Sequence, residues 1–165
     1  MSPISAARSA VNRSPVTRVE NKQTFEHLLQ LSDHGIVVIW VPGGPPPAEV
    51  ELTRRLHELQ PRVRFHACFD LDPAGIRIAR LITEKARITL EPTGMTADLL
   101  ADAPRKLPLE EWDYQELARQ SQQSDTFELL AVALADLGIK VEQETIQRSL
   151  YKRLLTATTA PATHF

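Results

Sequence analysis

From about residue 16 to residue 91, the chain alternates short apolar runs with stretches in which apolar residues recur every three or four positions. The first pattern is typical of strands and the second of amphipathic helices. Strands alternating with helices predict an α/β fold, a parallel sheet with helices on both faces. The predicted strands are Val16–Glu20, Ile36–Val41, Arg64–Phe69 and Arg87–Leu90, and the predicted helices are Thr24–Leu31, Ala48–Leu59 and Pro73–Glu84.

The apolar run Ile36–Val41 has no polar position, which is typical of a strand that is buried on both faces. Trp40, near its end, is therefore expected in the core. In the helix that follows, periodicity predicts an inward apolar face and an outward face with Arg54 and Arg55. The residues expected to point inward are Val50, Leu52, Leu56 and Leu59.

After Pro92 the pattern becomes helical. Helices are predicted over Glu110–Gln120, Thr126–Leu137 and Glu142–Leu155, with Gly138 as a natural helix stop. We therefore expect one domain over residues 16–155, with an α/β half at about 16–91 and a helical half at about 109–155. Residues 1–15 and 156–165 are expected to be flexible tails, because both are rich in small residues and lack periodicity.

Composition limits the functions that this chain can have. With 19 Lys and Arg against 21 Asp and Glu, its formal net charge is −2. Bulk charge therefore cannot hold it on nucleic acid, and any such contact needs a local patch. The single cysteine, Cys68, cannot form an internal disulfide, which favours a reducing, cytoplasmic location. No apolar run approaches the roughly 20 residues that cross a bilayer, so no membrane contact is expected.

Acidic residues gather where predicted strands end. Glu20 ends the first strand, and Asp70 and Asp72 follow the third. Parallel sheets bind ligands at this edge, and the strand period of two puts Asp70 and Asp72 on one side. Asp72 before Pro73 can also be explained as a helix cap alone, but capping does not explain Asp70. Carboxylates brought together repel unless a cation neutralises them, which favours Mg²⁺ or Mn²⁺.

Three segments together resemble the Toprim domain: Val19–Phe25 (VENKQTF), Gly43-Gly44, and Asp70–Ile78 (DLDPAGIRI). The likeness is closest to the nuclease subunit of Wadjet plasmid-defence systems and more distant to the A subunit of topoisomerase VI. Glu142-Gln143-Glu144 also resembles a Glu-Gln-Glu near the end of Wadjet-type nuclease subunits. The resemblance covers about Val16–Ile146.

This resemblance implies a divalent-metal-dependent DNA endonuclease in a multi-subunit anti-plasmid system. Glu20 would be the general acid/base or a metal ligand, and Asp70 and Asp72 the metal-binding pair. Glu144 and Glu142 would add acids at a second metal position. Candidate DNA contacts come from the Gly43-Gly44 loop and from three cations: Lys22, Arg77 and Arg80. Each cation is also consistent with an ordinary solvated surface.

The chain departs from the family pattern in two respects. Phe69 precedes the acidic motif where the Wadjet branch often has glycine. The family's upstream arm and winged-helix-like regions are not expected here, because the first strand is predicted to begin near Val16. The only tyrosines, Tyr114 and Tyr151, lie downstream, so hydrolysis is expected rather than transesterification. The expected partners are DNA and condensin-like SMC subunits, and a homodimer stays open. The alternative is a non-catalytic docking or DNA-sensing subunit on the same scaffold.

Overall fold

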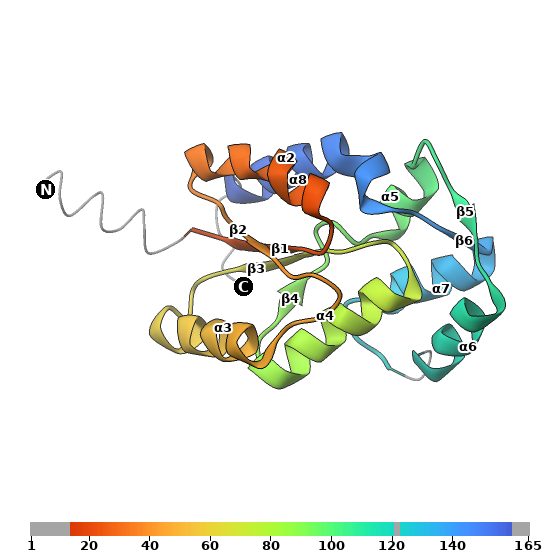
Figure 1. Ribbon diagram of the computed structural model, residues 1–165, viewed down its shortest axis with the longest axis horizontal. Helices are drawn as coiled ribbons and strands as arrows, with labels where there is room; N and C mark the ends of the chain where they lie inside the picture. The colour runs from red at the N-terminus through yellow and green to blue at the C-terminus, as the bar shows by residue number, and fades with distance from the viewer. Residues whose placement is uncertain (1–13, 121–122, 160–165) are drawn as a thin grey trace, which may run out of the picture.

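The computed structural model describes residues 14–120 and 123–159, with side chains up to residue 157. Its centre is a four-stranded parallel sheet in the order β2-β1-β3-β4, which confirms the α/β class (Figure 1). The strands are β1 (Val16–Val19), β2 (Val37–Trp40), β3 (Phe65–Cys68) and β4 (Leu90–Glu91).

Helices cover both faces of the sheet, as the alternating pattern predicts. Figure 1 shows α2 (Lys22–Leu28) and α8 (Gln147–Thr159) on one face, and α3 (Pro47–Leu59) and α4 (Pro73–Ala86) on the other. A 3-10 helix, η1 (Leu29–His34), continues α2. The apolar positions of α4 that periodicity points inward are all buried: Ile76, Ile78, Ala79 and Ile82. These side chains anchor α4, and with it the acidic motif at its start, to the sheet.

The second half of the chain is mainly helical, as expected. It contains α5 (Ala97–Asp102), α6 (Glu111–Gln120), α7 (Glu128–Leu137) and the 3-10 helix η2 (Gln143–Ile146). The short strands β5 (Leu107–Pro108) and β6 (Ile139–Lys140) form a separate antiparallel pair. Gly138 ends α7 with a φ of 63°, the left-handed conformation that glycine adopts most readily. Throughout the described residues, no helix has the length and apolar character that a membrane crossing needs.

Several predicted boundaries were wrong. The last helix starts at Gln147 and not at Glu142, because Gln143–Ile146 forms the 3-10 helix η2. The last helix does not end at Leu155, because α8 continues to Thr159 and Arg64 Nη1 donates to the Ala157 carbonyl at 3.0 Å. The fourth strand is Leu90–Glu91 rather than Arg87–Leu90, because α4 extends to Ala86 and Arg87 caps it in the left-handed conformation. Most of the two predicted tails, residues 1–13 and 160–165, lies outside the described residues.

Strand β2 is an edge strand, so the prediction that it is buried on both faces was wrong. Only β1 pairs with it among the described residues, and Trp40 is 42% exposed instead of lying in the core. The Trp40 ring packs against Phe25, with centroids 6.3 Å apart, and its Nε1 donates to the Glu20 carbonyl at 2.8 Å. Apolar composition predicts a strand but does not determine its place in the sheet.

The inward face of α3 also differs from the prediction, because strand β1 carries a fully buried arginine. Arg18 Nε donates to Glu49 Oε1 at 2.9 Å, and its Nη2 donates to the Thr53 hydroxyl. The face of α3 that packs on the sheet therefore carries polar partners for this guanidinium. Leu52 and Leu59, which were expected inside, are exposed, Leu59 by 78%, whereas Val50 and Leu56 pack against the core as expected.

Candidate functional site

The predicted acidic residues do gather at the carboxyl edge of the sheet. Strands β1 and β3 are hydrogen-bonded neighbours, and Val19 pairs with Cys68, the last residues of the two strands. Glu20 and Asp70 therefore leave the sheet side by side. Because both strands run in the same direction, their carboxyl ends meet at one edge, where parallel sheets bind ligands.

The acidic motif is held by the start of α4. Asp72 caps this helix, its Oδ1 accepting from the Gly75 amide at 2.6 Å, and Pro73 occupies the first helical position. A Cβ atom at Gly75 would lie 2.2 Å from the Asp70 carbonyl oxygen. The glycine of this motif is thus required because the helix packs directly against the backbone of Asp70.

A segment of the helical half returns across the acidic motif. Leu71 and Val141 form an antiparallel bridge with backbone hydrogen bonds of 2.9 and 3.0 Å. Two residues further on, the Gln143 amide donates to Asp70 Oδ1 at 2.8 Å. This pairing brings Glu142 and Glu144, more than 70 residues away in sequence, to the same edge as Asp70.

Gln143 is the residue that fixes this arrangement. Its side chain is fully buried: Nε2 donates to the Cys68 carbonyl, and Oε1 accepts from the Asn21 amide at 3.2 Å. One amide side chain therefore joins the ends of β1 and β3 to η2. The Asn21 side chain in turn donates to Glu144 and caps α2 through the Thr24 amide at 3.0 Å.

The acids at this edge shift one another's protonation. Burial, followed by the charges of Asp70 and Asp72, raises the pKa of Glu20 to about 7, while the nearby Arg77 opposes this rise. Burial also raises the pKa of Asp70 to about 6, against the hydrogen bond from Gln143. The charges of Asp72, Glu144 and Glu142 add to that rise, so these groups lie within electrostatic range of Asp70.

These carboxylates do not form a closed metal cage. Within residues 14–120 and 123–157, no three His, Cys, Asp or Glu side chains are grouped tightly enough to hold an ion. Asp70 and Asp72 each accept one backbone amide hydrogen bond through Oδ1, which leaves the second oxygen of each carboxylate available. The donor set is nevertheless all oxygen and surplus in negative charge, which fits Mg²⁺ or Mn²⁺ held partly through water.

Two of the candidate DNA-contacting cations lie on open surface. Arg77 is 54% exposed, near enough to Glu20 to lower its pKa, and lies 3.8 Å from Glu116. Lys22 is exposed and lies 3.8 Å from Glu26, an ordinary solvated pair.

The Gly43-Gly44 loop has open space at both α-carbons, with φ values of 64° and 155°. Both values lie in the region that favours glycine, and a ligand backbone can approach the loop closely.

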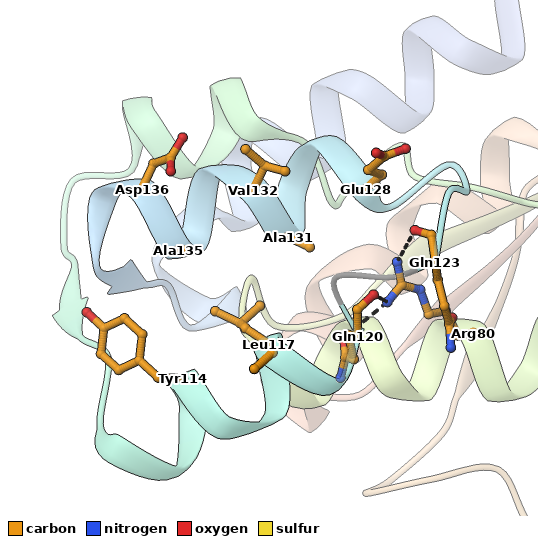
Figure 2. Close-up of a pocket in the computed structure, with 11 residues that line it drawn as sticks. Arg80, Tyr114, Leu117, Gln120, Gln123, Glu128, Ala131, Val132, Ala135 and Asp136 are labelled. Atoms are coloured by element: carbon orange, nitrogen blue, oxygen red, sulfur yellow. Dashed lines mark hydrogen bonds between the residues drawn. The ribbon is translucent and has the colours of Figure 1, made fainter.

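Arg80 lines the same groove as Arg77, but its guanidinium is already paired within the protein, so a DNA contact there stays a prediction. Its guanidinium, 10% exposed, pairs with Asp125 at 2.6 and 2.9 Å. Figure 2 shows it hydrogen-bonded to Gln120 and Gln123 as well. These bonds tie α4 to the chain between α6 and α7, which leaves Arg80 a structural role.

Two other residues of strand β3 are structural as well. Cys68 is buried, and burial raises the pKa of its thiol to about 12, which makes it an inert core residue. His66 is buried, and its Nδ1 lies 2.6 Å from the Thr93 hydroxyl. His66 is therefore a packed strand histidine.

Sequence reasoning did not single out Gln143, Asn21 or Lys140 as parts of the site. Lys140 donates to Asp113 Oδ2 at 2.8 Å. Burial raises the pKa of Asp72, and the charge of Lys140 opposes this rise. Asn21 follows Glu20 directly, and Gln143 lies between Glu142 and Glu144. These positions next to candidate acids were the signal that could have identified both residues. For Lys140 no local pattern gave one.

A separate groove of about 310 Å³ lies between α6 and α7 (Figure 2). Leu117, Ala131 and Val132 form its apolar floor, and Tyr114 and Asp136 lie at one end. None of the acids at the carboxyl edge lines it. The groove is therefore a second concave feature, distinct from the acidic site.

Comparison with family models gives one match, over residues 2–154, to the family described as "Protein of unknown function C-terminus (DUF2399)". This match covers nearly the whole chain, including every residue of the acidic edge. The chain belongs to this family. A search of curated proteins finds no match. The family description names no activity, so the function must be argued from the site.

Proposed function

We propose that this DUF2399 domain is a divalent-metal-dependent DNA endonuclease of Toprim type. The single observation that carries the proposal is the placement of Glu20 and the Asp70–Asp72 motif at the carboxyl ends of two hydrogen-bonded parallel strands. Motif order supports it too: an acid follows the first strand, a glycine pair follows the second, and Asp-x-Asp-Pro-x-Gly follows the third.

The roles of the chain's own residues follow from their places. Asp70 and Asp72 would hold Mg²⁺ or Mn²⁺, with Glu144 and Glu142 at the rim of the same edge. A bound divalent ion supplies charge neutralisation of phosphate oxygens and activation of water for hydrolysis. Glu20, whose pKa is raised to about 7, can accept or donate a proton near neutral pH. Arg77, half exposed beside it, would orient the phosphodiester.

The test is cleavage of supercoiled plasmid with and without Mg²⁺ or Mn²⁺. Glu20→Gln is the sharpest variant, because no side-chain hydrogen bond of Glu20 supports the fold among the described residues. We expect it to lower the cleavage rate by about 10²-fold or more, the usual effect of losing a general acid/base. Asp70→Asn should lower it as well and raise the metal concentration required.

Glu26→Gln is the matched control, since Glu26 is an exposed acid on α2 whose only described partner is Lys22 at 3.8 Å. It should cleave like the unaltered protein. Cleavage that persists at full rate in Glu20→Gln and in Asp70→Asn, or that needs no divalent ion, would contradict the proposal.

A second candidate function is a non-catalytic docking or DNA-sensing subunit. It is favoured by the hydrogen bonds that Asp72 accepts from Gly75 and Asp70 accepts from Gln143, because these bonds give both acids a structural role without an ion. This function predicts DNA binding without cleavage at any divalent-ion concentration, even with partner subunits present.

Under either function we expect the domain to act together with another protein region or subunit. The family is described as a C-terminus, and we infer that this further region or subunit binds the DNA. Condensin-like SMC genes encoded beside this one would support an anti-plasmid system of Wadjet type, and their products would be the partners to add to the cleavage assay.

A further inference from the structure

A basic cavity lies at the opposite end of the sheet from the acids. It has a volume of about 470 Å³ and is formed where α3 and α4 end and β3 begins. The residues of its lining that matter here are His57, Arg62, Arg64, Thr83, Arg87 and Glu91. Three arginines against one glutamate make this lining positive in a chain whose formal net charge is −2.

Internal pairing uses only one of these arginines. Arg64 binds Glu91 through two hydrogen bonds of 2.7 and 2.5 Å and donates a third to the Ala157 carbonyl. Glu91 is thereby neutralised. Arg62 and Arg87 have no acidic partner in the part of the chain that the structure describes, so two guanidinium groups at this cavity keep their full charge.

Arg87 occupies a backbone position that normally belongs to glycine. It ends α4 with a φ of 55° and is the only non-glycine residue with a positive φ among the described residues. Glycine adopts this conformation without the steric cost of a Cβ atom. An arginine in this strained conformation therefore points to a use for its side chain.

Two further polar atoms of the lining lack partners. His57 Nδ1 and Thr83 Oγ1 are buried, and neither has a hydrogen-bond partner among the described atoms. Buried polar groups are normally satisfied, so these two atoms are exceptions in the wall of this cavity.

We propose that this cavity binds a phosphate group through Arg62 and Arg87. A guanidinium matches phosphate oxygens in charge and in paired hydrogen-bond geometry. The volume lies within the range of small-ligand pockets, about 300–1,000 Å³, so a nucleotide fits as well as a bare phosphate. The phosphate can belong to a free nucleotide or to a DNA backbone, and only the second source rests on the proposed function.

The test measures ligand binding in the absence of divalent ions. The ligands are inorganic phosphate, a 5′-mononucleotide and a short DNA duplex, and binding is monitored by the NMR shifts of the backbone amides. The informative variant is Arg87→Gly, which removes the guanidinium and also the left-handed strain. We expect its phosphate affinity to fall at least tenfold while its melting temperature stays equal or rises. Arg62→Ala should weaken binding similarly, and Arg55→Ala, an exposed arginine paired with Glu51 on α3, should not.

Competition assigns the source of the phosphate. Displacement of inorganic phosphate by duplex DNA assigns the site to a DNA backbone, and displacement by the mononucleotide alone assigns it to a free nucleotide. Unchanged binding in Arg87→Gly, shifts confined to residues outside this cavity, or no binding of any of the three probes would overturn the proposal. Glu20→Gln should bind normally, which keeps this result separate from the nuclease test.

Discussion

At the residue scale, Gly75 decides whether the acidic motif can form. The start of α4 lies so close to the end of β3 that a Cβ atom at this position would be 2.2 Å from the Asp70 carbonyl oxygen. That oxygen belongs to backbone, which cannot rotate away as a long side chain can. Helix and strand end must therefore separate if residue 75 carries any side chain.

We expect Gly75→Ala to lower the free energy of unfolding by about 3 kcal/mol, the upper end of overpacking costs. Urea denaturation measures this loss. Gly43→Ala is the matched control: its Cβ meets nothing within 4 Å, so only the left-handed φ of 64° carries a cost, about 1 kcal/mol. Equal losses in the two variants would show that the contact with Asp70 is unimportant.

At the scale of elements, the short helix η2 links the two halves of the molecule. Gln143 at its start bonds to the ends of two strands, and its amide holds Asp70. The antiparallel bridge between Leu71 and Val141 fixes the register of this contact. The helical half thus determines where the acids of the α/β half point.

Gln143→Ala removes one buried and one partly buried side-chain hydrogen bond and leaves the Cys68 carbonyl without this partner. We expect a loss of about 2–3 kcal/mol in unfolding free energy, given a cost of about 1–3 kcal/mol for a buried group left unsatisfied. Hydrogen exchange should also rise at residues 141–146. Gln147→Ala, which removes a single 3.3 Å bond to Thr24, is the control and should cost less.

At the scale of the whole molecule, a nearly neutral chain concentrates negative charge at one end of its sheet and unpaired arginines at the other. Burial and mutual repulsion raise the pKa of Glu20 from 4.5 to about 7 and that of Asp70 from 3.8 to about 6. These acids therefore hold their protons more tightly in the folded protein than in the unfolded chain.

The stability that these two acids contribute is present below their unfolded pKa values and is lost as pH rises. We expect it to decline from about pH 4 and to be gone above about pH 7, because the unfolded chain ionises first. Urea denaturation across this range measures the slope. The double variant Glu20→Gln, Asp70→Asn should flatten it.

Millimolar Mg²⁺ should raise the melting temperature more at pH 8 than at pH 5, since only ionised carboxylates attract the ion. Equal effects at the two pH values would indicate that the ion binds elsewhere. The double variant is the control here as well, because it should lose the difference between the two pH values.

The chain's local patterns determined most of its elements. Period and composition predicted the first three strands, the inward face of α4, the stop at Gly138 and the Asp72 cap, because each depends on neighbours within one or two turns. The acids at one edge were also predictable, since parallel strands end on the same side and the motif follows strand ends.

Only the tertiary structure decided which strand lies at the edge, which face of α3 is buried and which arginines are left without an acid. Ile36–Val41 is apolar enough for a central strand, yet β1 and β3 occupy the centre. Arg18 makes the inner face of α3 polar, and Asp125 takes Arg80 away from the surface. Strand order and ion pairing depend on residues that are distant in sequence, so no local pattern predicts them.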